Sequence, residues 1–393
     1  MKRVAVVLLL ALAGLAALAV VRLFSGERRA PRPSVAVVEA LSTADSGFAR
    51  ADAPRPLAFP GDHGPHPEFR TEWWYYTGNL SAADGRRFGY QLTFFRIGLT
   101  ARPTRRDSRW AARDAWMAHF ALTDVGGRRF HARHRLARGA LDLAGADARP
   151  FRVWLEDWSA VATAPDASAM RLVAREGDVA LALDLRTMKP PALQGDRGWS
   201  RKGPEPGNAS YYYSLTRLET RGHVSVGADR VAVTGTSWMD REWSTSALGA
   251  GQVGWDWFAL QLDDGRDVMI YRLRRADGAV DPFSAGSVVA RDGTTTRLDA
   301  ADVHVEAQEW WTSRTTDVRY PSRWRVSIPR EHVTLDIAPR LADQEWTEPV
   351  RYWEGAVTVR GTAGQRPVAG EGYVELVGYG DATARRSRAR TTP

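Results

Sequence analysis

The chain has 393 residues, of which 44% are hydrophobic and 25% are charged, a balance that excludes a disordered protein and predicts two or three globular domains. The formal net charge is +8, but the basic residues are scattered singly, which excludes the concentrated basic patch typical of nucleic-acid binding. The chain has no cysteine, which excludes disulfides, thiolate nucleophiles and lipoprotein acylation.

An unbroken apolar segment begins the chain. Two basic residues precede residues 4–21, which are rich in Ala, Leu and Val. A run of this length fits either the core of a signal peptide or one membrane-spanning helix, and both predict export. Arg22 follows at once without a clean small-residue cleavage site, which favours an uncleaved anchor. We therefore expect residues 1–24 to be a signal peptide or membrane anchor, residues 25–56 to be an Ala/Pro-rich tether, and the protein to be periplasmic or held on the outer face of the inner membrane.

Turn signals of a β protein recur after residue 59. They separate short apolar and aromatic runs, and long amphipathic helical windows are few, so the pattern predicts an all-β fold. The turns are Asp84-Gly85, Gly126-Gly127, Asp264-Gly265, Asp277-Gly278 and Asp292-Gly293.

The clearest hairpin joins residues 71–80 to residues 88–96 through the first of these turns. Its second strand alternates apolar residues on one face with small and polar residues on the other. Residues 73–76, Trp-Trp-Tyr-Tyr, are aromatic on both faces. Such a strand needs cover on both sides, as in the wall of a barrel that is filled or holds a ligand.

A dense polar cluster precedes this hairpin. It comprises Asp62, His63, His66, Glu68 and Glu72. Two imidazoles with a carboxylate suit a metal or general acid–base chemistry, yet the Pro-rich loop lacks the helical spacing of a zincin motif. The alternative is that these groups hydrogen-bond the loop backbone and close a barrel mouth. We predict no metal and no cofactor, and keep three of the five residues, His63, His66 and Glu72, as site candidates.

Four motifs carry a resemblance to a known family. They are Phe59-Pro60 with Asp62-His63-Gly64 and His66; Glu72-Trp73-Trp74-Tyr75 with Thr77-Gly78; Gly198-Trp199-Ser200-Arg201-Lys202-Gly203 with Ala209-Ser210-Tyr211-Tyr212-Tyr213-Ser214; and Gly235-Thr236-Ser237-Trp238-Met239-Asp240 with Glu242-Trp243-Ser244. With these motifs the chain resembles the AttH-type secreted lipocalin-like proteins, relatives of carotenoid 1,2-hydratase (hydroxyneurosporene synthase). The resemblance implies two tandem lipocalin-like (calycin) antiparallel barrels.

An internal repeat agrees with two barrels. Residues 255–273 repeat the order of aromatic strand, Asp-Gly-Arg turn and aromatic-aliphatic strand seen in residues 73–96. We place the first barrel at residues 57–221 and the second at residues 222–385.

A second polar cluster lies at the end of the fourth motif, where Asp240, Arg241 and Glu242 stand between Trp238 and Trp243. Desolvation between indoles raises a carboxyl pKa, as a proton donor to an alkene requires. Protonation of an isolated double bond makes a carbocation that water captures, and aromatic faces stabilise the cation. The alternative is a salt-bridged turn between packing tryptophans.

The sequence departs from the hydratases that it resembles. Those enzymes place a histidine two residues before the tryptophan, where this chain has Arg241, and a tyrosine two residues before the proton-donating aspartate. The counterparts here are Tyr271 and Leu273. Arginine does not exchange protons near neutral pH and leucine has none to donate, so catalysis would need Asp240, Glu242 or Glu72.

The aromatic content suits a cavity for a long apolar ligand. The chain has 16 Trp, 11 Tyr and 12 Phe, most of them expected in barrel cores. The main hypothesis is an exported protein that binds a hydrophobic small molecule, a lipid or terpenoid, at the cell envelope; the resemblance implies an ABC transporter permease as a further partner. The alternative is a carotenoid 1,2-hydratase-like enzyme or secreted hydrolase with a carboxylate general acid.

The candidate residues fall into two groups. The catalytic candidates are Asp240, Glu242, Glu72, His63 and Tyr271. The candidates for ligand binding are Trp73, Trp74, Tyr75, His66, Trp238, Arg241, Trp243 and Trp257.

Overall fold

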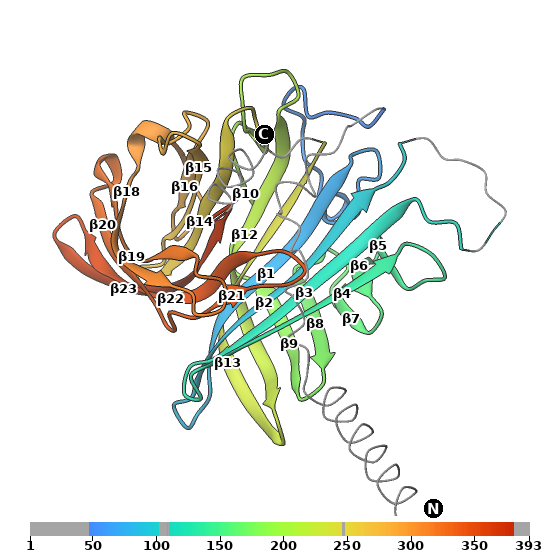
Figure 1. Ribbon diagram of the computed structural model, residues 1–393, viewed down its shortest axis with the longest axis horizontal. Coiled ribbons are helices and arrows are strands. Elements are labelled where there is room, and N and C mark those ends of the chain that lie inside the picture. The colour runs from blue at the N-terminus through green and yellow to red at the C-terminus, as the bar shows by residue number, and fades with distance from the viewer. Residues whose placement is uncertain (1–46, 102–107, 109, 246–247, 381–393) are drawn as a thin grey trace, which may run out of the picture. The chain divides into compact units, whose positions relative to one another are not determined.

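The computed structural model describes residues 47–101, 108, 110–245 and 248–380, and in them the all-β prediction is confirmed (Figure 1). Besides strands, these residues form three single-turn 3₁₀ helices, η1 (Gly61–His63), η2 (Ala300–Asp302) and η3 (Pro329–Glu331). None of the helices in this part of the chain is long and apolar enough to cross a bilayer. The expected anchor and most of the expected tether fall on residues 1–46, outside the described residues.

The first antiparallel sheet curls into a nearly closed barrel. Its strands follow the order β4 (Arg129–Arg138), β3 (Asp114–Asp124), β2 (Arg87–Gly98), β1 (Thr71–Ser81), β13 (Asp229–Ser244), β12 (Ala209–Val226), β9 (Val179–Thr187), β8 (Ala169–Glu176), β7 (Trp158–Ala162), β6 (Phe151–Leu155) and β5 (Ala144–Ala148). Two short strands pair with β12, namely β10 (Ala192–Leu193) and β11 (Trp199–Arg201).

The second antiparallel sheet curls into a half-barrel. Its strands follow the order β17 (Thr295–Asp299), β16 (Ala285–Val289), β15 (Asp267–Arg275), β14 (Gln252–Leu262), β23 (Arg366–Val377), β22 (Tyr352–Ala363), β20 (Val333–Pro339), β19 (Arg319–Ile328) and β18 (His304–Thr312), and β21 (Glu345–Trp346) pairs with β22.

The boundary expected between residues 221 and 222 lies inside β12, and the change of sheet comes between β13 and β14. The long hairpin β12–β13 belongs to the first sheet because β13 pairs with β1 along the whole of that strand. Gly222 is a close approach within the strand: its φ is +153°, and a Cβ there would lie 2.1 Å from the carbonyl oxygen of Ala182. Gly222, at which the boundary was placed, is therefore needed for strand packing within β12.

The internal repeat is confirmed by the two hairpins β1–β2 and β14–β15. Their turns share one geometry, with Gly85 at φ +87° and Gly265 at φ +90°. In each turn the following arginine donates to the aspartate side chain, over 2.8 Å for Arg86 and 2.9 Å for Arg266. In each sheet the first strand also pairs with the last, β1 with β13 and β14 with β23.

The two aromatic faces of β1 are covered from different directions. Trp74 and Tyr76 point into the core of the first barrel, which packed side chains fill. Trp73 and Tyr75 point the other way and pack in a cluster with residues of β14 and β15. The expected cover on both sides is present, but the second sheet supplies half of it. Of the two alternatives left open by the sequence, a filled barrel and a barrel that holds a ligand, the packed core of the first barrel agrees with the filled one.

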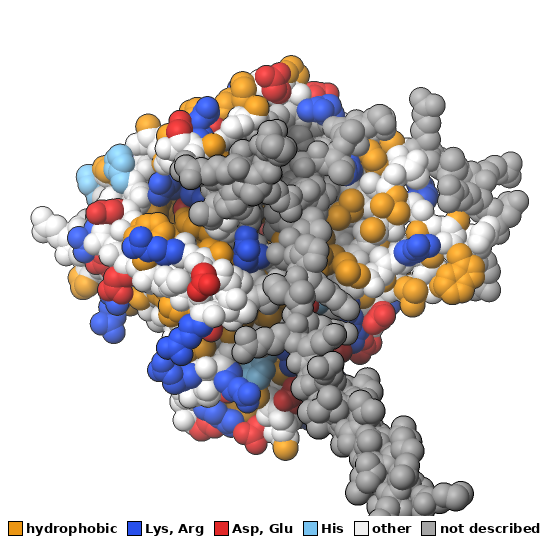
Figure 2. All heavy atoms as spheres, in the orientation of Figure 1, with side chains coloured by type: hydrophobic (Ala, Val, Ile, Leu, Met, Phe, Trp, Pro, Cys, Tyr) orange, Lys and Arg blue, Asp and Glu red, His pale blue; other side chains and the backbone are white. Residues whose placement is uncertain are grey.

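The surface visible in Figure 2 mixes Lys and Arg with Asp and Glu over its described residues. Many of the arginines are in ion pairs, such as Arg325 with Asp336 at 2.8 Å. Pairing of this kind leaves no concentrated basic patch on this face.

Candidate functional site

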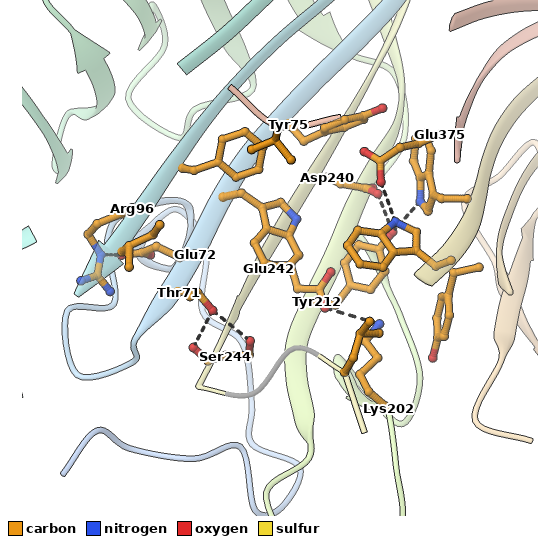
Figure 3. A pocket seen from close by; sticks show the side chains of 18 of the residues that line it. Thr71, Glu72, Tyr75, Arg96, Lys202, Tyr212, Asp240, Glu242, Ser244 and Glu375 are labelled. Carbon is orange, nitrogen blue, oxygen red and sulfur yellow. Dashed lines mark hydrogen bonds and ion pairs between the residues drawn. The ribbon is translucent and has the colours of Figure 1, made fainter. Parts of the chain in front are cut away.

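A cavity of about 160 Å³ lies between the outward faces of the two sheets (Figure 3). Strands β1, β2 and β13 form one wall, and β14, β15 and β23 form the other. The alternation of side chains along a strand explains the location, because the residues of β1 and β14 that do not enter a barrel core project toward the opposite sheet. The lining includes seven aromatic residues, namely Trp73, Tyr75, Phe95, Tyr212, Trp255, Trp257 and Tyr271.

The aromatic lining is held in place by contacts between the sheets. The ring of Tyr75 meets that of Trp257 edge to face, with centroids 5.1 Å apart. The Trp257 indole Nε1 donates to the Tyr212 hydroxyl over 3.2 Å. Rings fixed in this way present flat faces to the cavity without needing to reorganise when a ligand binds.

Asp240 lies in the wall formed by the first sheet. It pairs with Tyr75 on β1 and with Ser214 on β12, and its side chain is buried. The Asp240 carboxylate accepts hydrogen bonds from Ser214 Oγ at 2.6 Å, from Trp238 Nε1 at 2.6 Å and from the Tyr212 hydroxyl. Burial raises the pKa of Asp240 to about 6, although these three donors oppose the rise. Asp240 is therefore mainly ionised at neutral pH.

Glu375 lies in the wall formed by the second sheet, on β23, where it pairs with Trp257 and Glu354. Burial raises the pKa of Glu375 to about 7, against a hydrogen bond of 2.5 Å from Trp255 Nε1 to Oε1 that lowers it. The negative charge of Asp240 adds to the rise, and the two carboxyls lie side by side in Figure 3. About half of the Glu375 side chains are protonated at neutral pH.

Glu375 was missed by the reasoning from sequence. The signal available was weak: a single glutamate between Val374 and Leu376 in an apolar strand. Period-2 alternation places such a residue opposite to the core face, where a glutamate is expected to meet water. Only the packing of the two sheets shows that this face is covered.

Glu354 is a second buried acid, directly across from Glu375. The Tyr75 hydroxyl donates to its Oε1 atom. Burial raises the pKa of Glu354 well above its ordinary value, and the neighbouring Glu375 adds to the rise. Its environment therefore favours the protonated form, and the hydrogen bond holds Tyr75 in the cavity wall.

Lys202 and Glu242 supply a pair of opposite charges at the cavity. Lys202 follows β11, and its Nζ lies 3.4 Å from Glu242 Oε1. The same Nζ is 3.8 Å from the ring centroid of Tyr271 and 5.2 Å from that of Tyr212. Burial alone would lower the pKa of Lys202, but Glu242 and Tyr271 outweigh it and the net shift is upward. Lys202 is thus a fixed cation.

The sequence model of the AttH-like family matches residues 50–379. The chain belongs to the AttH-like family.

Two solved structures are similar to this AttH-like protein. It is 34% identical to a candidate AttH from Nitrosomonas europaea, with a TM-score of 0.76 over 84% of this chain and 99% of that one. Kievitone hydratase from Nectria haematococca shares the fold at 15% identity, with a TM-score of 0.65 over 86% and 97% of the two chains.

One protein of similar sequence is an enzyme with a named activity. Kievitone hydratase from Fusarium solani subsp. phaseoli is 24% identical over 222 residues, which are 55% of the AttH-like chain. The match spans 61% of the length of that enzyme.

The polar cluster near residues 62–72 closes the mouth of the first barrel in the AttH-like protein. Glu72 is fully buried and pairs with both Arg96 and Arg241. Burial alone would raise the pKa of Glu72, but Arg241, His66 and Arg96 outweigh it and hold the pKa well below its ordinary value. Glu72 reaches the edge of the cavity, yet both of its oxygens are engaged in ion pairs. Among the described residues, no group of three or more His, Asp or Glu is arranged to hold a metal.

The two histidines of this cluster lie away from the cavity lining. His63 Nδ1 is 2.6 Å from the Tyr213 hydroxyl, and burial lowers the pKa of His63 to about 4, so the ring is neutral at pH 7. The ring of His66 stacks on Trp243 with centroids 3.8 Å apart. Arg241 lies over the ring of Trp74 at 3.9 Å. These contacts fix the loop against the barrel.

The structure thus divides the sequence-based candidates. The cavity lining includes Asp240, Glu242, Tyr271, Trp73, Tyr75 and Trp257, with Glu72 at its edge. Trp238 reaches it indirectly, as a donor to Asp240. Besides Trp238, five other candidates are not part of the lining, namely His63, His66, Trp74, Arg241 and Trp243.

Proposed function

We propose that this AttH-like protein is a hydratase-like enzyme that adds water across a carbon–carbon double bond of an apolar substrate bound between the two sheets. The observation that carries the proposal is that two carboxyls, Glu375 from one sheet and Asp240 from the other, line one aromatic cavity, and that burial raises the pKa of each toward neutrality, to about 7 and to about 6. Titratable groups whose environments separate their pKa values are typical of an acid and a base. The sequence similarity to kievitone hydratase supports the same reaction class.

In the proposed mechanism Glu375 is the general acid. Its Oε1 accepts from Trp255, and no hydrogen bond from the described residues reaches Oε2, which is free to hold the proton toward the substrate. The π electrons of the alkene take this proton and form a C–H bond, which leaves a carbocation on the other carbon and a carboxylate on Glu375. The faces of Trp257 and Tyr75 stabilise the cation.

Asp240 is the general base. A water molecule attacks the carbocation and forms the C–O bond, and Asp240 takes the proton that the water releases. The product is an alcohol. One proton has then moved from Glu375 to Asp240, and its return through water in the cavity restores both groups.

Glu375 in this scheme replaces the acid of the hydratases that the chain resembles. Leu273 stands at that position and lines the cavity as an apolar residue. An acid from β23 can serve the same space as an acid from β15, because both strands flank β14.

Incubation of purified protein with kievitone and a panel of terpenoid alkenes in H₂¹⁸O tests the function. Mass spectrometry should find a product heavier by one labelled water, and Glu375→Gln and Asp240→Asn should each lose it. If no alkene in the panel is hydrated while the variants bind ligands as the wild type does, the enzyme assignment is wrong.

The second candidate function is binding of a hydrophobic small molecule without chemistry, which the aromatic lining of the same cavity favours. This function would be supported by an apolar compound that co-purifies with the protein and that the variant Asp240→Asn still binds. Export to the periplasm or the outer face of the inner membrane, and work beside an ABC transporter permease, remain proposals from the sequence. Cell fractionation and the mass of the mature N-terminus test the location.

A further inference from the structure

The Lys202–Glu242 pair has no role in the proposed acid–base steps, although it lies in the cavity wall. A lysine ammonium has three N–H donors. Among the described residues, Glu242 is the only anionic partner recorded for Lys202, and its other neighbours are the ring faces of Tyr271 and Tyr212. Donor capacity therefore remains on Nζ for a bound molecule.

The pair is built to keep its position. The Lys202 backbone N–H donates to the Asn208 carbonyl over 2.8 Å, and its carbonyl accepts from Gln252 Nε2 over 2.7 Å. The ammonium is held over the Tyr271 ring, whose hydroxyl is 3.0 Å from Ser200 Oγ. A cation fixed at both its backbone and its head binds an oxygen with little loss of conformational entropy.

The charges of Lys202 and Glu242 determine which chemical group of a ligand can bind between them. Glu242 offsets the positive charge of Lys202, and Asp240 and Glu375 add acid groups to the same cavity, so a carboxylate or phosphate gains little there. A hydroxyl both donates and accepts a hydrogen bond. It matches an ammonium and a carboxylate 3.4 Å apart, because it can accept from Lys202 and donate to Glu242.

We infer that the substrate is an alkene that carries a hydroxyl or phenol, and that Lys202 and Glu242 bind this oxygen. The inference rests on the proposed function for the alkene and adds the polar end of the molecule. Because Lys202 and Glu242 line the same cavity as Asp240 and Glu375, the polar end and the reacting carbons share one site. A purely hydrocarbon substrate would leave the remaining N–H donors of Lys202 buried without an acceptor, which costs binding free energy.

Binding of a matched pair of probes tests the inference without turnover. The probes are 4-(3-methylbut-2-enyl)phenol and its methyl ether, which differ only in the hydroxyl hydrogen and one methyl group, and quenching of tryptophan fluorescence reports both dissociation constants. The wild type should bind the phenol about tenfold or more tightly than the ether, the range expected of a hydrogen bond to a charged group. Lys202→Met removes a donor that both probe oxygens can use and should weaken the binding of both. The charge-balanced double variant Lys202→Met/Glu242→Gln also removes the carboxylate that accepts from the phenol, and it should lose most of the preference.

Lys189→Met is the matched control. Lys189 is also a buried lysine in an ion pair, 2.7 Å from Asp267, but it is not part of the cavity lining. The variant Lys189→Met should be less stable than the wild type and should keep the preference for the phenol. Equal binding of the two probes by the wild type, or an unchanged preference in the double variant, overturns the inference. If the protein prefers the phenol but hydrates no alkene, the binding role of Lys202 and Glu242 stands and only the enzymatic function is refuted. If the protein hydrates alkenes but binds both probes alike, the enzymatic function stands and the binding role is refuted.

Discussion

Replacing Glu375 with glutamine is expected to remove hydration activity and, at the same time, to stabilise the fold at neutral and alkaline pH. Glutamine keeps the shape of glutamate and can still accept the hydrogen bond from Trp255, but it cannot transfer a proton. Loss of a positioned general acid slows a reaction by about 10²–10⁴. The loss should fall on kcat, with KM little changed.

The gain in stability follows from the pKa of Glu375, which burial raises from an ordinary 4.5 to about 7. Below pH 4.5 the carboxyl is protonated in the folded and the unfolded chain. Between pH 4.5 and 7 the unfolded chain loses the proton and the folded chain keeps it, so the free energy of unfolding falls as pH rises. Each pH unit is worth about 1.4 kcal/mol. The raised pKa therefore lowers the free energy of unfolding by at most about 3 kcal/mol. Because Glu375 is only partly buried, solvent screening reduces this effect to about 1–3 kcal/mol.

Urea denaturation at pH 4.5 and pH 8, followed by tryptophan fluorescence, measures this difference. The difference in the free energy of unfolding between Glu375→Gln and the wild type should be about 1–3 kcal/mol more in favour of the variant at pH 8 than at pH 4.5. Glu371→Gln, on the same strand with its carboxylate paired to Arg340, is the matched control and should show no such gain. Full activity in Glu375→Gln, or an advantage that does not grow with pH, would refute the reasoning.

Three further changes separate the roles of the cavity residues. Asp240→Asn should lower kcat by about 10²-fold or more and remove the acid limb of the pH–rate profile near pH 6, since the base must be ionised. Trp255→Phe removes a hydrogen bond that lowers the pKa of Glu375, so the alkaline limb near pH 7 should move upward; a limb that stays in place would argue against Glu375 as the acid. Glu72→Gln removes the carboxylate partner of buried Arg241 and one of the two carboxylate partners of buried Arg96, and it should lower the free energy of unfolding in urea by about 3–5 kcal/mol without moving either limb.

Local pattern predicted much of the fold correctly. Alternation and Asp-Gly turns depend on residues close in sequence, so the hairpins, the all-β class and the internal repeat could be predicted from sequence. The four motifs identified the family, and Asp240 and Glu242 were recognised as acids among indoles. The resemblance also indicated Leu273 as a departure from the hydratases, and it lies in the cavity wall.

The polar cluster at residues 62–72 shows where composition misleads. Its histidines and carboxylates have the chemistry of a site, but buried arginines from distant strands occupy them. Sequence proximity could not reveal these partners, because Arg96 and Arg241 reach Glu72 only through strand pairing.

The sequence by itself determined that residues 73–76 of β1 are aromatic on both faces and that both faces must be covered. Only the tertiary structure decided what covers them: a packed core on one side and the other sheet on the opposite side. Period-2 alternation distinguishes two faces of a strand but does not say what lies against either. For this reason the cavity between the sheets, and the approach of Glu375 to Asp240 across it, depend on long-range packing that no local pattern encodes.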